Sequence, residues 1–128
     1  MKILAFDHIN IAMPADGEAQ ARAFYGDVLN LTEIAVPMAL AGYPVIWFQS
    51  GDVVIHLGVD EDFHPSGRAH PALLVDDLDG FLARCREHGV LLDGTQPPLD
   101  GYRREHIFDP FGNRLEIMQR YGAPYTIR

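Results

Sequence analysis

The chain has 128 residues, of which 48% are hydrophobic and 22% are charged. These values are typical of one folded domain and exclude a largely disordered chain. The formal net charge of −8 argues against nucleic acid or an anionic membrane as a partner, because phosphate binding needs a cationic surface. Cys85 is the only cysteine, which rules out an intrachain disulfide and fits a reducing cytoplasm.

The first half of the chain predicts one strand, one helix and three further strands. Residues 6–13 alternate between two faces, as a half-buried strand does. An amphipathic helix is expected next, with Asp16 as its cap and its end near Asn30. Its apolar stripe at i, i+3, i+4 and i+7 consists of Ala21, Phe24, Tyr25 and Val28. Short apolar segments between turn residues predict strands over 32–36, 43–49 and 52–58.

The second half repeats this pattern after a polar, turn-rich linker at 60–67. Asp76 or Asp77 is expected to cap its helix, which ends at Gly89. The helix stripe has the same spacing as the first and consists of Leu78, Phe81, Leu82 and Cys85. Strands are expected over 69–75, 90–92, 102–108 and 113–119. The prediction is one α+β domain of two β-α-β-β-β modules, residues 1–59 and 68–120, with a tail at 121–128 whose Pro124 and Tyr125 pack on a neighbouring surface.

Candidate metal ligands occupy matching places in the two modules. His70 follows His8 by 62 positions, and Glu116 follows His56 by 60. Each of the four alternates with apolar residues that should face the helix of its module, so each is expected on the concave side of the sheet. A single strand histidine is more often structural, but the matched spacing favours a metal. The pattern therefore predicts one divalent ion held by His8, His56, His70 and Glu116.

His106 is a further candidate, because it shares strand parity with Arg104 and Phe108 and could face the same cavity. It could contact substrate or transfer a proton. Three arginines of this region include candidate anion binders: Arg103, Arg104 and Arg114.

Four segments together resemble the vicinal oxygen chelate superfamily, which includes glyoxalase I, extradiol dioxygenases and bleomycin-resistance proteins. They are DHINI at 7–11, AFYGDVLNL at 23–31, HPALLVDDL at 70–78 and DPFGNRLE at 109–116. The resemblance implies paired modules that form a cupped, eight-stranded, barrel-like site around a divalent metal. It carries over His8, His70 and Glu116 as ligands.

The same resemblance narrows the activity. In glyoxalase I-like members the fourth ligand is commonly Glu or Gln, whereas this chain has His56. Fosfomycin thiol transferases are similar in size and ligands, but their potassium loop has no match in residues 96–101. Bleomycin-binding members lack metal ligands, unlike this chain.

A set of three histidines and one glutamate suits Zn, Ni, Co, Mn or Fe. Four protein ligands leave two positions of an octahedral ion, enough for a small substrate chelated through neighbouring oxygens. Proton abstraction would then fall to Glu116, to His106 or to hydroxide at the metal. We therefore expect a metal-dependent, glyoxalase-like lyase or isomerase, which forms a homodimer. An extradiol-type dioxygenase is the alternative if His56 does not ligate, and a non-catalytic small-molecule-binding protein is the rival class.

Overall fold

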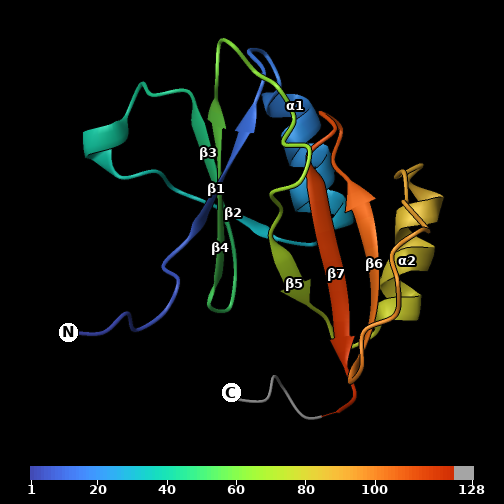
Figure 1. Ribbon diagram of the computed structural model, residues 1–128. Helices are drawn as coiled ribbons and strands as arrows, with labels where there is room; N and C mark the ends of the chain where they lie inside the picture. The colour runs from blue at the N-terminus through green and yellow to red at the C-terminus, as the bar shows by residue number, and fades with distance from the viewer. Residues whose placement is uncertain (123–128) are drawn as a thin grey trace. The chain divides into compact units, whose positions relative to one another are not determined.

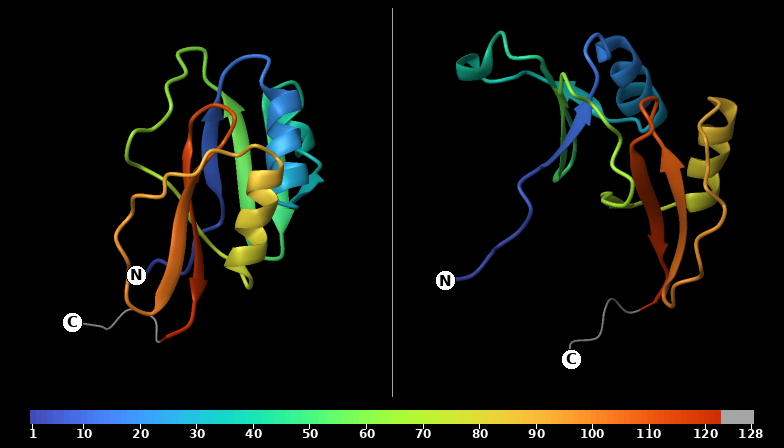
Figure 2. Two further views of the ribbon diagram at one scale, coloured as in Figure 1. Left: turned by 90° about the vertical axis from the view of Figure 1, so that its right-hand side faces the viewer. Right: turned by 45° about the horizontal axis from the view of Figure 1, so that its top comes forward.

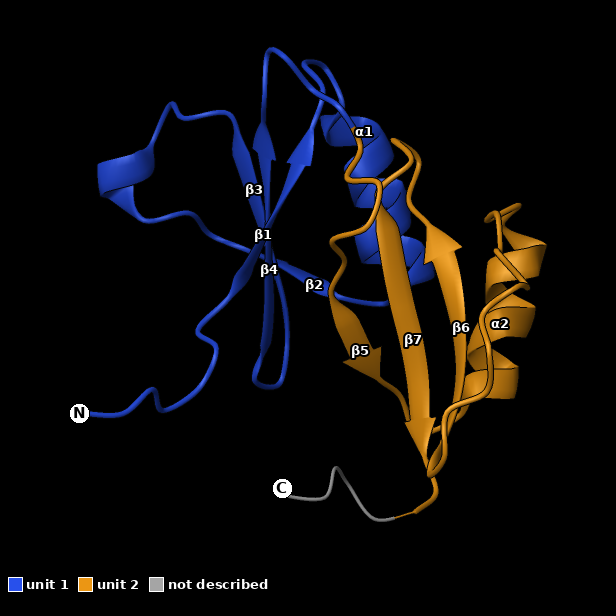
Figure 3. Ribbon diagram, in the orientation of Figure 1, with its two compact units in different colours: residues 1–64 blue, residues 65–128 orange. Residues whose placement is uncertain are grey.

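The computed structural model describes residues 1–122. It divides into two compact units, residues 1–64 and residues 65–128, drawn in different colours in Figure 3. The boundary between them falls inside the segment predicted as a linker, residues 60–67. Each unit is built on its own sheet.

The first unit is a four-stranded sheet, and α1 and η1 connect its first two strands along the chain. Its sheet has the order β1-β4-β3-β2, in which β1 is parallel to β4 and the other pairs are antiparallel. The elements are β1 (Ile9–Met13), α1 (Glu18–Ala21), η1 (Arg22–Val28), β2 (Thr32–Ile34), η2 (Met38–Leu40), β3 (Val45–Ser50) and β4 (Val53–Val59). The predicted β-α-β-β-β order is confirmed, with η2 as a short 3-10 turn in addition.

The first helix buries its predicted stripe but begins and continues differently from the prediction. Asp16 does not cap it: this residue has φ 63° in a turn closed by Gly17 N donating to Pro14 O at 3.2 Å, and the helix begins after Gly17 without a side-chain cap. After α1 the helix widens into the π-helical η1. Asn30, with φ 58°, leaves the helical conformation where the end was predicted.

The second unit is a three-stranded sheet of order β5-β7-β6, with β5 parallel and β6 antiparallel to β7. Its elements are β5 (Ala72–Leu74), α2 (Leu78–Glu87), β6 (Tyr102–Phe108) and β7 (Arg114–Arg120). The helix α2 lies alongside this sheet in Figures 1 and 2. The strand predicted over 90–92 is a single bridge between Leu92 and Ile107, because Gly89 (φ 71°) and Gly94 (φ 72°) bend the chain on either side.

The helix α2 is fixed at its start and along one side. Asp77 is its N-cap, and its Oδ1 accepts a hydrogen bond from Gly80 N at 3.0 Å, which decides between the two predicted caps. Leu78, Leu82 and Cys85 are buried, as the stripe predicts. Burial raises the pKa of the Cys85 thiol to about 11, so this cysteine is a packing residue.

The two sheets have the same internal pairing pattern around their central strands. In the first unit, His56 on β4 lies opposite Trp47 on β3. In the second, Glu116 on β7 lies opposite His106 on β6. Both central strands also pair in parallel with the first strand of their unit. The repeat seen in the sequence is thus a repeat of strand pairing, in which Trp47 takes the place that His106 has in the second unit.

A tight turn joins β6 to β7 and sets this register. The Asp109 side chain accepts from Asn113 N at 2.8 Å and from Asn113 Nδ2 at 2.9 Å. Both residues are buried, and Gly112 supplies the left-handed conformation with φ 89°. The turn belongs to the DPFGNRLE segment, so the motif is structural at its start and carries a candidate ligand at its end.

None of the helices in residues 1–122 is long and apolar enough to span a membrane. Pro124 and Tyr125, which were predicted to pack on a neighbouring surface, lie outside the described residues.

Candidate metal centre

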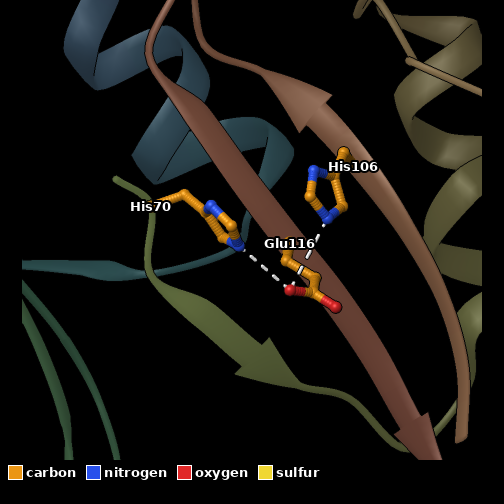
Figure 4. Close-up of side chains that lie close together, drawn as sticks. All are labelled: His70, His106 and Glu116. Atoms are coloured by element: carbon orange, nitrogen blue, oxygen red, sulfur yellow. Dashed lines mark hydrogen bonds and ion pairs between the residues drawn. The ribbon is translucent and has the colours of Figure 1, made fainter. Parts of the chain in front are cut away.

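Three side chains of the second unit converge on one point (Figure 4). His70 comes from the segment before β5, His106 from β6 and Glu116 from β7, and their ligand atoms all lie within 4.8 Å of one another. Glu116 Oε1 lies 3.1 Å from His70 Nε2 and 3.5 Å from His106 Nε2. Two imidazoles and a carboxylate in this proximity form a donor set that suits a divalent transition metal.

Glu116 is the centre of the cluster and stays charged although it is buried. Its Oε1 faces both imidazoles, while Oε2 accepts a hydrogen bond from Arg104 Nη1 at 3.0 Å. Burial by itself raises the pKa of this carboxyl, but its contacts with Arg104 and His70 outweigh burial and hold the pKa below its ordinary value. One oxygen of the carboxylate therefore faces the imidazoles, and the other faces the guanidinium.

The ring of His70 is oriented as in a metal ligand. Its Nδ1 lies 2.8 Å from Arg68 O, and because a carbonyl only accepts, Nδ1 carries the hydrogen. In the neutral ring, Nε2 then directs a lone pair at the Glu116 carboxylate, 3.1 Å away. Two acceptors cannot face each other at this distance without a cation or a proton between them. A divalent metal meets this requirement, and the backbone carbonyl behind the ring is the usual support of a ligating histidine.

His106 is almost completely enclosed, with 4% of its side chain exposed. Its buried Nε2 has no hydrogen-bond partner among residues 1–122, although the atom is directed at the cluster. Burial lowers the pKa of this imidazole, and the charge of Glu116 opposes that shift only in part. The ring is therefore neutral at pH 7, available for polar contact at the centre.

The arginines predicted as candidate anion binders are engaged by carboxylates of the chain itself. The pairs are Arg103 with Asp79 at 2.6 Å, Arg104 with Glu116 at 3.0 Å and Arg114 with Asp93 at 2.6 Å. Of these, Arg104 contacts Glu116 and Arg114 contacts His106. Both arginines therefore act on residues of the cluster and not, in the first place, on an outside anion.

The other two predicted ligands form a pair in the first unit. His8, just before β1, stacks on His56 with ring centroids 4.0 Å apart, and its Nδ1 lies 2.8 Å from Asp7 Oδ1. His56 is buried, and burial, followed by the charge of His8, lowers its pKa. The structure thus brings together His8 with His56 and, separately, His70 with Glu116. That all four hold one ion stays a prediction.

Trp47 and Asp93, which contact these groups, were not predicted from the sequence. Trp47 stacks on His56 at 3.9 Å, and it could have been found by counting across the hairpin at residues 50–53. Asp93 follows the bridge at Leu92 and reaches Arg114, 21 positions away, so no local pattern indicates it.

Comparison with known proteins finds a matching family and similar solved structures. Residues 5–117 match the family model described as the Glyoxalase/Bleomycin resistance protein/Dioxygenase superfamily. The chain is 36% identical to a Bacillus anthracis protein described as a glyoxalase family protein, over 94% of this chain and 98% of that one, with a TM-score of 0.84. A search of curated proteins finds no match.

Two more distant structures share the fold. The fosfomycin resistance protein FosX from Listeria monocytogenes is 18% identical, with 95% of this chain and 94% of that chain covered and a TM-score of 0.77. A glyoxalase/dioxygenase from Nostoc punctiforme is 23% identical, with 94% and 98% covered and a TM-score of 0.73. One FosX structure is a complex with Mn(II) and sulfate.

Proposed function

Since the chain belongs to the glyoxalase/bleomycin resistance protein/dioxygenase superfamily, we propose that it is a metal-dependent enzyme of the glyoxalase-like lyase or isomerase type. Its substrate would be a small molecule held through neighbouring oxygens. The observation that carries the proposal is the 3.1 Å approach of His70 Nε2 to the Glu116 carboxylate, with Nδ1 of the same ring directed at Arg68 O, an arrangement that a divalent ion held by both groups accounts for.

In this proposal His70 and Glu116 hold one divalent ion, and His8 and His56 are expected to complete its ligand set. Zn, Ni, Co, Mn or Fe suits these donors, and the Mn(II) complex of FosX supports an ion of this group. When bound, the ion supplies Lewis-acid stabilisation of negative charge on substrate oxygens. Glu116 and His106 are the proposed catalytic residues, because the buried Nε2 of His106 is directed at the same point.

A second candidate function is supported by the composition of the cluster. His70, His106 and Glu116 are two histidines and one carboxylate, the set found in oxygenases that keep open positions on non-haem iron. If His106 ligates and His56 does not, extradiol cleavage of a catechol becomes the better assignment. A non-catalytic binding protein is the third alternative, favoured if metal-free protein binds the same ligands equally well.

Metal analysis of protein purified without a histidine tag tests the proposal. We expect about one divalent ion per chain in the wild type and strong depletion in Glu116→Gln. Glu33→Gln is the matched control, because it removes a carboxylate that pairs with Arg22 at the surface. Full occupancy in Glu116→Gln would refute the assignment. Protein of measured metal content should then be screened against dicarbonyl–thiol adducts, catechols and epoxides.

A further inference from the structure

We propose that Arg114 and Asp93 hold His106 in the tautomer with its hydrogen on Nε2, so that His106 donates a hydrogen bond at the metal centre and does not ligate the ion. The inference rests on the proposed metal function and deepens it. It separates the three side chains of the cluster into two ligands and one donor.

The first step is the contact between Arg114 and His106. Arg114 Nη1 lies 2.9 Å from His106 Nδ1. A guanidinium has hydrogen-bond donors only and keeps its charge at any ordinary pH, so Nδ1 has to offer its lone pair. A neutral imidazole carries a single hydrogen, which is therefore on Nε2.

The second step is that Arg114 is itself held in place. The same Nη1 donates to Asp93 Oδ2 at 2.6 Å, so its two hydrogens go to Asp93 and His106. Asp93 also accepts from Thr95 N at 3.1 Å and from Gln96 Nε2 at 3.2 Å. On its other side the guanidinium lies over the Phe108 ring, 4.7 Å from the centroid. Arg114 and Asp93 are thus positioning residues that act through His106.

The third step is the contrast with His70. The carbonyl of Arg68 fixes the hydrogen of that ring on Nδ1 and leaves the lone pair on Nε2. Both rings direct Nε2 at Glu116, but only His70 presents a lone pair there. The backbone acceptor makes one histidine a ligand, and the guanidinium makes the other a donor.

A donor at this place has a defined task. The Nε2–H group of His106 can hydrogen-bond a substrate oxygen that gains negative charge, as an enolate or alkoxide oxygen does. In this tautomer Nε2 cannot take a proton, so removal of a proton from substrate would fall to another group, such as Glu116. The proposed substrate class is therefore one in which charge develops on an oxygen beside the metal-held pair.

Nitrogen-15 NMR of protein with labelled histidines tests the assignment, with Zn²⁺ as a diamagnetic probe. In metal-free protein, the two-bond proton–nitrogen pattern should show Nδ1 of His106 as an unprotonated nitrogen. On adding Zn²⁺, Nε2 of His70 should shift to a metal-bound position while Nε2 of His106 keeps its hydrogen. A zinc-bound His106 Nε2, or a hydrogen on His106 Nδ1 in metal-free protein, would overturn the inference.

Two variants test the positioning residues. Arg114→Met should release the tautomer of His106, and Asp93→Asn should do so in part, since it removes the charge that holds Arg114. Arg103→Met is the matched control, because that arginine pairs with Asp79 and not with the cluster. An unchanged His106 pattern in Asp93→Asn and Arg114→Met would overturn their roles, and Asp93→Asn decides alone if Arg114→Met fails to fold. Failure of the wild type to take up Zn²⁺ would instead contradict the proposed metal function. The two failures are distinguishable, because the tautomer of His106 is read from the metal-free spectrum.

Discussion

Trp47 lies flat against His56, with ring centroids 3.9 Å apart and planes inclined by 2°. The pair occupies the register place that His106 and Glu116 hold in the second unit. One module thus carries an aromatic ring where the other carries a polar donor. Trp47 limits the rotation of the His56 ring, which favours a fixed orientation of its nitrogens.

If His56 is a ligand, His56→Ala should weaken metal affinity by about 10- to 100-fold, by comparison with the loss of ligand support at other metal sites. Trp47 is the only tryptophan, so its fluorescence provides the titration signal. His56→Glu should restore binding. His64→Ala, at an exposed linker histidine, is the control. Unchanged affinity and coordination in His56→Ala would make His56 a pocket residue and move the dioxygenase assignment ahead.

Arg104→Met should lower metal affinity by roughly tenfold, because it removes the hydrogen bond that holds Oε2 of Glu116. Competition with a chelator measures the change. Arg103→Met, on the neighbouring residue of β6, should leave the affinity as it is. Equal effects of both variants would mean that Arg104 acts through general charge and not through Glu116.

Asp77→Ala should destabilise the protein by about 1 kcal/mol, the usual effect of losing a helix N-cap. Urea unfolding followed by circular dichroism measures it. Asp76→Ala removes the neighbouring carboxylate without removing the cap. The prediction is wrong if the two variants lose the same stability.

Stability should fall at high pH partly through Cys85. Its pKa is about 11 in the folded chain against an ordinary value of 9.0, so the unfolded chain loses the thiol proton first. The stabilisation is complete below pH 9 and is lost between pH 9 and 11, at up to about 1.4 kcal/mol per pH unit. Cys85→Ala should show a smaller loss over this range in urea unfolding, whatever its starting stability. Parallel curves for the two proteins would contradict the shift.

A homodimer remains our expectation for the assembly. β1 and β5 are edge strands of their sheets. Exposed apolar side chains precede β1 along the chain (Ile3, Leu4 and Phe6), and one belongs to β5 (Leu74). Light scattering should give twice the chain mass of 14.3 kDa. A monomer at micromolar concentration would refute the dimer.

The modules were predictable from the sequence because their signals are local. Strand alternation and helix stripes depend on neighbours along the chain, and the strand over 102–108 is confirmed as β6 to the residue. The predicted cap at Asp16 was wrong, because Asp16 adopts a left-handed conformation in the turn before the helix, which these local patterns do not indicate. The strand over 90–92 failed because glycines on both sides leave too little extended chain to pair.

The candidate site was predictable only in part. Parity and the repeat selected His70 and Glu116, and strand parity brought His106 into consideration. The carbonyl of Arg68 and the carboxylate of Asp93, which determine what each ring can do, act through tertiary contacts. Residue type and spacing carry no information about which nitrogen of a histidine bears its hydrogen.

The turn between Asp109 and Asn113 has a consequence for protein engineering. Deleting one residue there would shift β7 against β6 and move Glu116 to the opposite face, away from His106. Such a deletion should abolish the centre more completely than replacing either side chain. Transferring His106 and Glu116 into another scaffold would therefore require the whole β6–β7 hairpin, turn included, and His70 would have to be supplied from the segment before a neighbouring strand.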